Sequence, residues 1–199
     1  MAKVIQFPIP SPEKFGFKPV RKKDKTEKGK HRQLDLFSAG KVISLSKLTR
    51  FEEALMLDDL GDKKAKDIYQ KAIDEGDSVA DAYCNLGILE SQEKNYSKAI
   101  DCFTKSLKEN PRHFEAHYNL ANLYAEVGNL ALAKVHYQIS IEIEPYFSNS
   151  HFNLGLTLAM NKEIDEAIQS LLFYCRLVSS TEKIQAEELI SSLSRSLGN

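Results

Sequence analysis

The spacing of apolar residues divides the chain near Leu48. Beyond that point apolar residues recur at three- and four-residue intervals, which is typical of amphipathic helices. Residues 1–46 lack this periodicity, are rich in lysine and proline, and hold too few apolar side chains to offset the entropy of ordering. The sequence therefore predicts an all-α body preceded by a disordered basic tail.

The helical part of the chain contains an internal repeat. The segments 82–111, 116–145 and 150–179 align in register, and Pro111 and Pro145 are separated by one full period of this alignment. Four positions of the alignment keep one type of residue: a leucine, a small residue after it, an alanine, and a large apolar residue. These are Leu86, Leu120 and Leu154; Gly87, Ala121 and Gly155; Ala99, Ala133 and Ala167; and Phe103, Tyr137 and Leu171.

This pattern resembles the tetratricopeptide repeat (TPR), a helical hairpin of about 34 residues. Each position has a physical reason: small residues such as Gly87 and Ala99 let the two helices approach, and Phe103 fills the space between hairpins. Pro111 and Pro145 end the second helix of their repeats. The resemblance implies a right-handed α-solenoid of about four hairpins with a C-terminal capping helix.

The domain boundaries follow from this alignment. We expect a tail over residues 1–46 and a TPR domain over 47–199. The repeats are expected at about 47–79, 80–113, 114–147 and 148–181, with a capping helix over 182–197. The first repeat is the weakest copy, and Ala54 takes its small position in the first helix. In the capping helix, Ile184, Ile190, Leu193 and Leu197 form the expected apolar stripe.

Composition narrows the class of protein. The apolar runs are shorter than the roughly 18 residues that a membrane span needs, and prolines interrupt the apolar N-terminus, so we expect a cytoplasmic protein. Cys84, Cys102 and Cys175 are odd in number and widely spaced, which favours neither a disulfide framework nor a zinc site. Cys84 and Cys175 are expected to pack as small apolar residues.

The sequence holds no motif of an enzyme. It has no phosphate-binding loop, nucleophile elbow or zinc-protease motif, so we predict no catalytic residues, no cofactor and no metal site. His113 and His117 are four positions apart, but His113 falls in a turn and His117 takes a position that an aromatic residue usually fills. Packing between helices is the interpretation that we favour for both.

The candidate binding site is the concave groove that the first helices of such repeats line. Asn85, Asn119 and Asn153 recur at the same position of successive repeats on these helices, and their amides suit the backbone of an extended peptide. The alternative is that each asparagine only satisfies neighbouring helix ends or water. The expected groove residues are Asn85, Ile88, Tyr118, Asn119, Asn122, Phe152, Asn153 and Leu156, beside the acidic residues Asp81, Glu115 and Glu126.

Charge further describes the expected partner. Some members of the family hold the C-terminal carboxylate of chaperones with lysine and arginine at groove positions where this chain has Cys84, Tyr118 and Phe152, or acidic residues. The resemblance therefore favours a neutral or basic extended peptide. We expect a protein or peptide partner and no membrane partner.

The tail is strongly basic. Residues 1–50 contain 13 Lys and Arg against 4 Asp and Glu, whereas residues 51–199 contain 14 against 24. The run RKKDKTEKGKHR suits contact with nucleic-acid phosphates, but it lacks the interleaved aromatic residues that stack on bases. A solvated tail is the alternative.

Within the tail, QLDLF resembles the pentapeptide by which bacterial replication and repair proteins dock on the DNA sliding clamp. The matching residues are Gln33, Leu34, Asp35, Leu36 and Phe37. The resemblance implies an alternative function as a replication or repair adaptor on that clamp. The remaining alternatives are that these residues fold back on repeat one or bind another partner.

Overall fold

The computed structural model describes residues 48–197. Within this range the chain forms nine helices and no strand, so the predicted all-α fold is confirmed. The helices are α1 Arg50–Asp59, α2 Ala65–Asp74, α3 Val79–Gln92, α4 Tyr96–Glu109, α5 Phe114–Glu126, α6 Leu130–Ile143, α7 Ser148–Met160, α8 Ile164–Leu177 and α9 Ser180–Leu197. No helix of the described range is long and apolar enough to cross a lipid bilayer.

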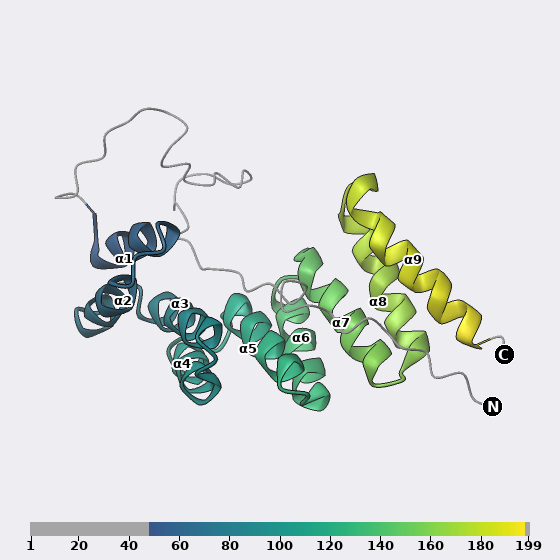
Figure 1. Ribbon diagram of the computed structural model, residues 1–199, viewed down its shortest axis with the longest axis horizontal. Helices are drawn as coiled ribbons and strands as arrows, with labels where there is room; N and C mark the ends of the chain where they lie inside the picture. The colour runs from purple at the N-terminus through teal and green to yellow at the C-terminus, as the bar shows by residue number, and fades with distance from the viewer. Residues whose placement is uncertain (1–47, 198–199) are drawn as a thin grey trace.

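The helices pack as consecutive hairpins along the long axis of the molecule (Figure 1). Helices α1 and α2, α3 and α4, α5 and α6, and α7 and α8 form the four hairpins, and α9 packs on α8. The second helix of each hairpin also contacts the first helix of the next. In addition, α5 touches both α3 and α7. The first helices α3, α5 and α7 therefore share one continuous surface, which we call the first-helix face.

Small residues bring the helices of a hairpin together as the sequence predicts. A Cβ atom built on Gly87 would lie 2.8 Å from the Phe103 ring, and one on Gly155 would lie 2.7 Å from Leu171 Cγ. Real Cβ atoms do not approach other carbon atoms this closely. Glycine at these positions thus allows Phe103 and Leu171 to be fully buried between the helices.

The turns inside the last three hairpins share one backbone feature. Lys94, Gly128 and Lys162 occupy equivalent positions and all adopt positive φ angles of 63°, 82° and 65°. A left-handed conformation costs a non-glycine residue about 1–2 kcal/mol. Two of the three turns adopt this conformation with a lysine, in spite of its cost. The packing of the two helices therefore determines the conformation of the turn, whether or not the residue is glycine.

Helix α9 closes the solenoid with an apolar stripe that shares Ile190 and Leu193 with the predicted one, while the side chain of Leu197 lies outside the described part of the chain. Ala186 and Leu193 are buried, and Leu189 and Ile190 pack beside them against the hydrophobic core that α7 and α8 contribute to. The prediction for Ile184 is wrong, because its side chain is 57% exposed. Residues 186, 189, 190 and 193 occupy one side of the helix, and position 184 lies two positions before that series, on the opposite side.

Candidate functional site

The charged side chains of the helices that form the first-helix face are all acidic. Helices α3, α5 and α7 contain four carboxylates and neither lysine nor arginine: Asp81, Glu90, Glu115 and Glu126. Between residues 79 and 177 the basic residues lie on the second helices or in turns. They are Lys94, Lys98, Lys105, Lys108, Arg112, Lys134, Lys162 and Arg176. A cation that approaches this face therefore meets no like charge on these three helices.

The three repeated asparagines are buried at the contacts between hairpins. Asn85 Nδ2 donates to Tyr69 OH at 3.2 Å, which joins α3 to the hairpin before it. Asn119 Nδ2 lies 3.5 Å from Cys84 Sγ and so joins α5 to α3. The amides thus take part in polar contacts within the solenoid, and their use by a peptide stays a prediction.

The third asparagine belongs to a larger network between the last two hairpins. Asn153 Nδ2 donates to Asn122 Oδ1 at 2.9 Å and to Tyr118 OH at 3.1 Å. Tyr137 OH donates to the same Asn122 oxygen at 2.6 Å. Burial raises the pKa of Tyr118 to about 12, so its hydroxyl remains protonated at any physiological pH. The network connects α5 and α7 through Tyr118, Asn122 and Asn153, which the sequence analysis assigned to the groove, and reaches α6 through Tyr137, which it did not.

The apolar residues predicted for the groove differ in exposure. Ile88 and Tyr118 are buried, and the Tyr118 ring lies edge-on to Phe147 at 5.0 Å between centroids. Phe152 and Leu156 on α7 are only partly buried. The Phe152 ring also lies 4.9 Å from that of Tyr174 on α8. Phe152 and Leu156 are therefore the apolar residues of the predicted set that have exposed surface.

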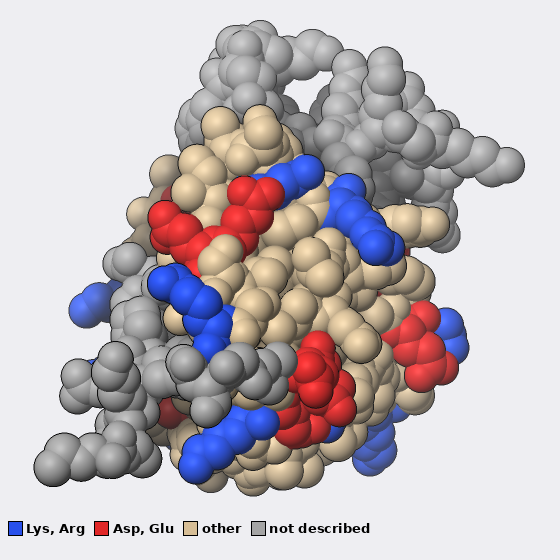
Figure 2. Space-filling view, turned by 90° about the vertical axis from the view of Figure 1, so that its right-hand side faces the viewer, with Lys and Arg blue, Asp and Glu red and all other residues tan. Residues whose placement is uncertain are grey.

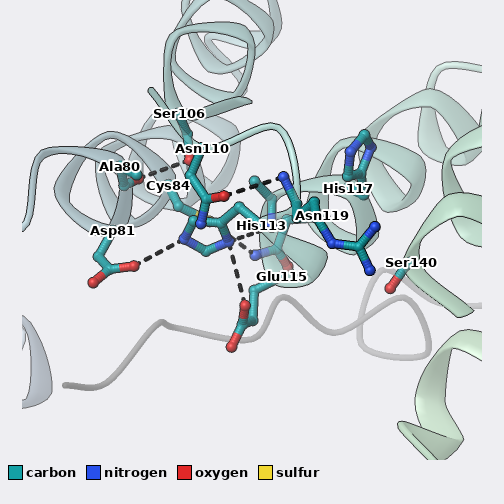
Figure 3. A network of polar contacts seen from close by, with 12 residues as sticks. Ala80, Asp81, Cys84, Ser106, Asn110, His113, Glu115, His117, Asn119 and Ser140 are labelled. Carbon is teal, nitrogen blue, oxygen red and sulfur yellow. Dashed lines mark hydrogen bonds and ion pairs between the residues drawn. The ribbon is translucent and has the colours of Figure 1, made fainter. Parts of the chain in front are cut away.

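Two of the carboxylates enclose a buried imidazole at the junction of α3 and α5 (Figure 3). His113 is the N-cap of α5, and its Nε2 lies 2.9 Å from Asp81 Oδ1. Its Nδ1 lies 3.2 Å from Glu115 Oε2 and also 3.2 Å from the amide nitrogen of Ala116. The side chain of His113 is almost fully buried, whereas those of Asp81 and Glu115 are 33% and 17% exposed.

The protonation of His113 decides which of these contacts it makes. Burial alone lowers the pKa of His113, but the hydrogen bonds and charges of Asp81 and Glu115 together raise this pKa to about 9. At neutral pH the imidazolium therefore donates to both carboxylates. In the neutral form Nδ1 instead accepts the Ala116 N–H and caps the helix. His113 thus pairs with the two carboxylates when it is protonated and caps helix α5 when it is neutral.

Two other histidines fasten the turns between hairpins. His117 Nε2 lies 3.2 Å from the carbonyl oxygen of Pro111, and His151 Nε2 lies 2.8 Å from that of Pro145. Burial lowers the pKa of both, so each ring is neutral and donates its Nε2–H to the proline. In His117 the Nδ1 lone pair then accepts from His136 Nδ1 at 2.9 Å. This role was missed, although a histidine at the same distance after each closing proline was a visible signal.

Models of the tetratricopeptide repeat match residues 80–113, 102–134 and 136–169. The chain contains tetratricopeptide repeats. Three solved structures have the same fold. The first TPR of Spaghetti (RPAP3), bound to the HSP90 peptide SRMEEVD, is 18% identical, covers 60% of this chain and 94% of its own, and has a TM-score of 0.57.

The other two structures cover more of the chain. MamA from Desulfovibrio magneticus RS-1 is 17% identical over 75% of this chain and 84% of its own, with a TM-score of 0.65. YrrB, described as a TPR protein with an unusual peptide-binding site, is 20% identical over 73% of this chain and 76% of its own, with a TM-score of 0.61. At these identities the likeness concerns the fold alone. No curated protein is significantly similar to the chain in sequence.

The TPR solenoid holds its cysteines in different environments. Cys84 and Cys102 are buried and Cys175 is partly exposed. Burial raises the pKa of Cys84 and raises that of Cys102 to about 11, so both remain neutral thiols. Over residues 48–197 no group of three or more His, Cys, Asp and Glu side chains is arranged to hold a metal ion.

The tail motif lies outside the TPR repeats. Gln33, Leu34, Asp35, Leu36 and Phe37 fall outside the described residues. Docking on a sliding clamp, phosphate contact by the basic run, and fold-back on repeat one therefore stay predictions.

Proposed function

We propose that the protein is a non-catalytic adaptor that binds an extended peptide segment of a partner protein on the first-helix face. The observation that carries this proposal is the composition of that face. The first helices α3, α5 and α7 pack side by side and present the partly exposed Phe152 and Leu156 together with carboxylates, without a lysine or arginine. The repeated asparagines lie buried beneath this surface. The peptide bound to RPAP3 and the peptide-binding site described for YrrB support a peptide as the partner.

The negative charge of the first-helix face disfavours acidic peptides. The peptide SRMEEVD bound to RPAP3 carries three acidic residues. On this chain a peptide of that kind meets Asp81, Glu115 and Glu126 and finds no basic residue on α3, α5 or α7. Like charges at an interface cost binding free energy. We therefore infer that the partner segment is neutral or basic, with an apolar residue that packs on Phe152 and Leu156.

A selection from a random 12-residue peptide library against the full chain tests this function. We expect the enriched peptides to be neutral or basic, and their binding to fall at least tenfold in Phe152→Ser and Leu156→Ser. Binding to Leu132→Ser and Val135→Ser should be unchanged, because these residues are exposed on the second helix α6. Circular dichroism melting of every variant separates loss of binding from loss of fold.

The asparagines need a separate test because they are buried. Replacing Asn85, Asn119 and Asn153 together with alanine should abolish peptide binding if their amides read the peptide backbone. Each single replacement that keeps a cooperative thermal transition should weaken binding by about 1 kcal/mol. Library peptides that bind Phe152→Ser as tightly as the unaltered chain, or an enriched set that is acidic, would refute the proposed site.

A further inference from the structure

The charges of this chain are divided between its two parts. Residues 1–47, the N-terminal arm, contain 12 Lys and Arg against 4 Asp and Glu, whereas residues 48–199 contain 15 against 24. The basic residues are densest in residues 18–32, which hold 8 Lys and Arg against 2 Asp and Glu. The arm and the solenoid therefore attract each other electrostatically.

Among the surfaces of the solenoid, the first-helix face keeps uncompensated negative charge near α5. His113 supplies a single positive charge to both Asp81 and Glu115. Glu126 is exposed and accepts a hydrogen bond from the neutral hydroxyl of Tyr96 at 2.8 Å. The nearby His117 and His136 are neutral, since burial lowers both pKa values.

The remaining first-helix carboxylate has a basic partner, and the end of the solenoid closed by α9 carries charges of both signs. Glu90 lies 2.9 Å from Lys66 Nζ, which also pairs with Glu93 at 2.7 Å, so Lys66 offsets part of the Glu90 charge. On the end closed by α9, acidic and basic side chains are interspersed and separated by uncharged surface (Figure 2). The first-helix face around Asp81, Glu115 and Glu126 therefore offers a basic segment negative charge without a lysine or arginine on α3, α5 or α7.

Chain length permits the arm to reach this surface. Sixteen residue steps separate Arg32 from Leu48, and such a segment spans up to about 55 Å when extended. The arm joins the solenoid at α1, and the packed pairs α1 with α2, α2 with α3, and α3 with α5 lead from there to the surface (Figure 1). Packed helices are about 8–10 Å apart, so these three steps amount to at most about 30 Å. A tethered segment is also present at an effective concentration in the millimolar range, whatever the protein concentration.

We propose that residues 18–32 bind the first-helix face of their own chain beside Asp81, Glu115 and Glu126. This inference rests on the proposed function, because the arm takes the surface that the partner peptide would use. The arm then acts as a built-in competitor, and a partner segment gains the surface only by displacing it. Occupation by the arm of a second copy is the alternative that the experiment must distinguish.

Zero-length carbodiimide cross-linking of the full chain tests the contact directly. Lysines of residues 18–32 should couple to Asp81, Glu115 and Glu126 rather than to exposed carboxylates of the second helices such as Asp101 and Asp165. Equimolar ¹⁴N- and ¹⁵N-labelled protein should give links within one isotopic form. Addition of 0.5 M NaCl should reduce these links, because salt screens exposed charges. Equal coupling to Asp101 and Asp165, or links of mixed isotopic composition, would overturn the proposal.

Competition by a labelled probe measures the consequence. The probe is a fluorescein-labelled peptide of residues 18–32, and the variant replaces Lys22, Lys23, Lys25 and Lys28 with glutamine in the full chain. The variant should bind the probe about tenfold more tightly than the unaltered chain. In the unaltered chain the tethered arm competes with the probe, and an arm with an effective concentration of about 1 mM and a Kd of about 0.1 mM weakens probe binding by about that factor.

A control variant changes the same number of charges elsewhere. Replacing Lys98, Lys105, Lys108 and Arg112 with glutamine, on α4 and in the turn after it, should leave probe affinity within twofold of the unaltered chain. Equal affinities of the arm variant and the unaltered chain would overturn the built-in competition and leave the peptide site standing. Absence of probe binding to both would overturn docking of the arm, while the library peptides decide the proposed function independently.

Discussion

His113 gives the solenoid a stability that depends on pH in a defined direction. The perturbation is His113→Asn, because asparagine is also a good N-cap but does not titrate. Its side chain replaces the helix-capping role of the neutral imidazole and removes the cation between Asp81 and Glu115. The comparison of the two proteins over pH therefore isolates the charge of His113.

The magnitude follows from the pKa of His113, about 9 in the folded chain and about 6.5 when unfolded. Between these values the folded state holds a proton that the unfolded state has released. The stabilisation is fully present below pH 6.5 and is lost as the pH rises through 9. Between pH 7 and 8.5 the loss is about 2 kcal/mol, at about 1.4 kcal/mol per pH unit.

Urea unfolding followed by circular dichroism at pH 7.0, 7.5, 8.0 and 8.5 measures this effect. The difference in free energy of unfolding between the unaltered chain and His113→Asn should shrink by about 2 kcal/mol over that range. The other histidines and the cysteines are common to both proteins and cancel in the difference. A difference that stays constant over the range would show that His113 is not protonated between its two carboxylates.

Three further predictions concern packing and titration. Gly87→Ala should destabilise the fold by about 1–3 kcal/mol in urea unfolding, because its Cβ meets the Phe103 ring, whereas an exposed Ser97→Ala should change little. Burial lowers the pKa of His136 to about 4, so the difference in free energy of unfolding between the unaltered chain and His136→Phe should fall by about 2 kcal/mol between pH 7 and 5, because the unfolded chain takes up the proton first. In the native protein iodoacetamide should label Cys175 first; equally fast labelling of Cys84 would contradict its burial.

The repeat spacing was sufficient to predict the hairpins and the close contacts inside them. Gly87 and Phe103 lie on neighbouring helices of one hairpin, and their sizes already indicate that one makes room for the other. Such pairs are predictable because both members recur once in every repeat. A contact that is repeated in every hairpin therefore appears in the sequence as a repeated pair of residue types. The apolar stripe of α9 has no second copy, and the prediction for Ile184 was wrong.

The candidate site was predictable in its residues but not in their contacts. The sequence places Asn153 on a first helix, yet only the packing of α7 on α5 and α6 brings its amide to Asn122 and Tyr118. Similarly, Asp81 and His113 belong to different repeats and are 32 residues apart. Their pairing depends on the offset between successive hairpins, which no single repeat encodes.

The sequence by itself determined the helices, their pairing into repeats and the sign of charge on each helix, since these properties depend on residue type and spacing within a single repeat. The tertiary structure decided which polar groups are buried and what they meet. It converted His113 from a turn residue into a cation held by Asp81 and Glu115, and His117 and His151 into donors that fasten the preceding proline turns. Burial and neighbouring charge set the protonation and bonding of a side chain, and both arise only when separate hairpins are packed together.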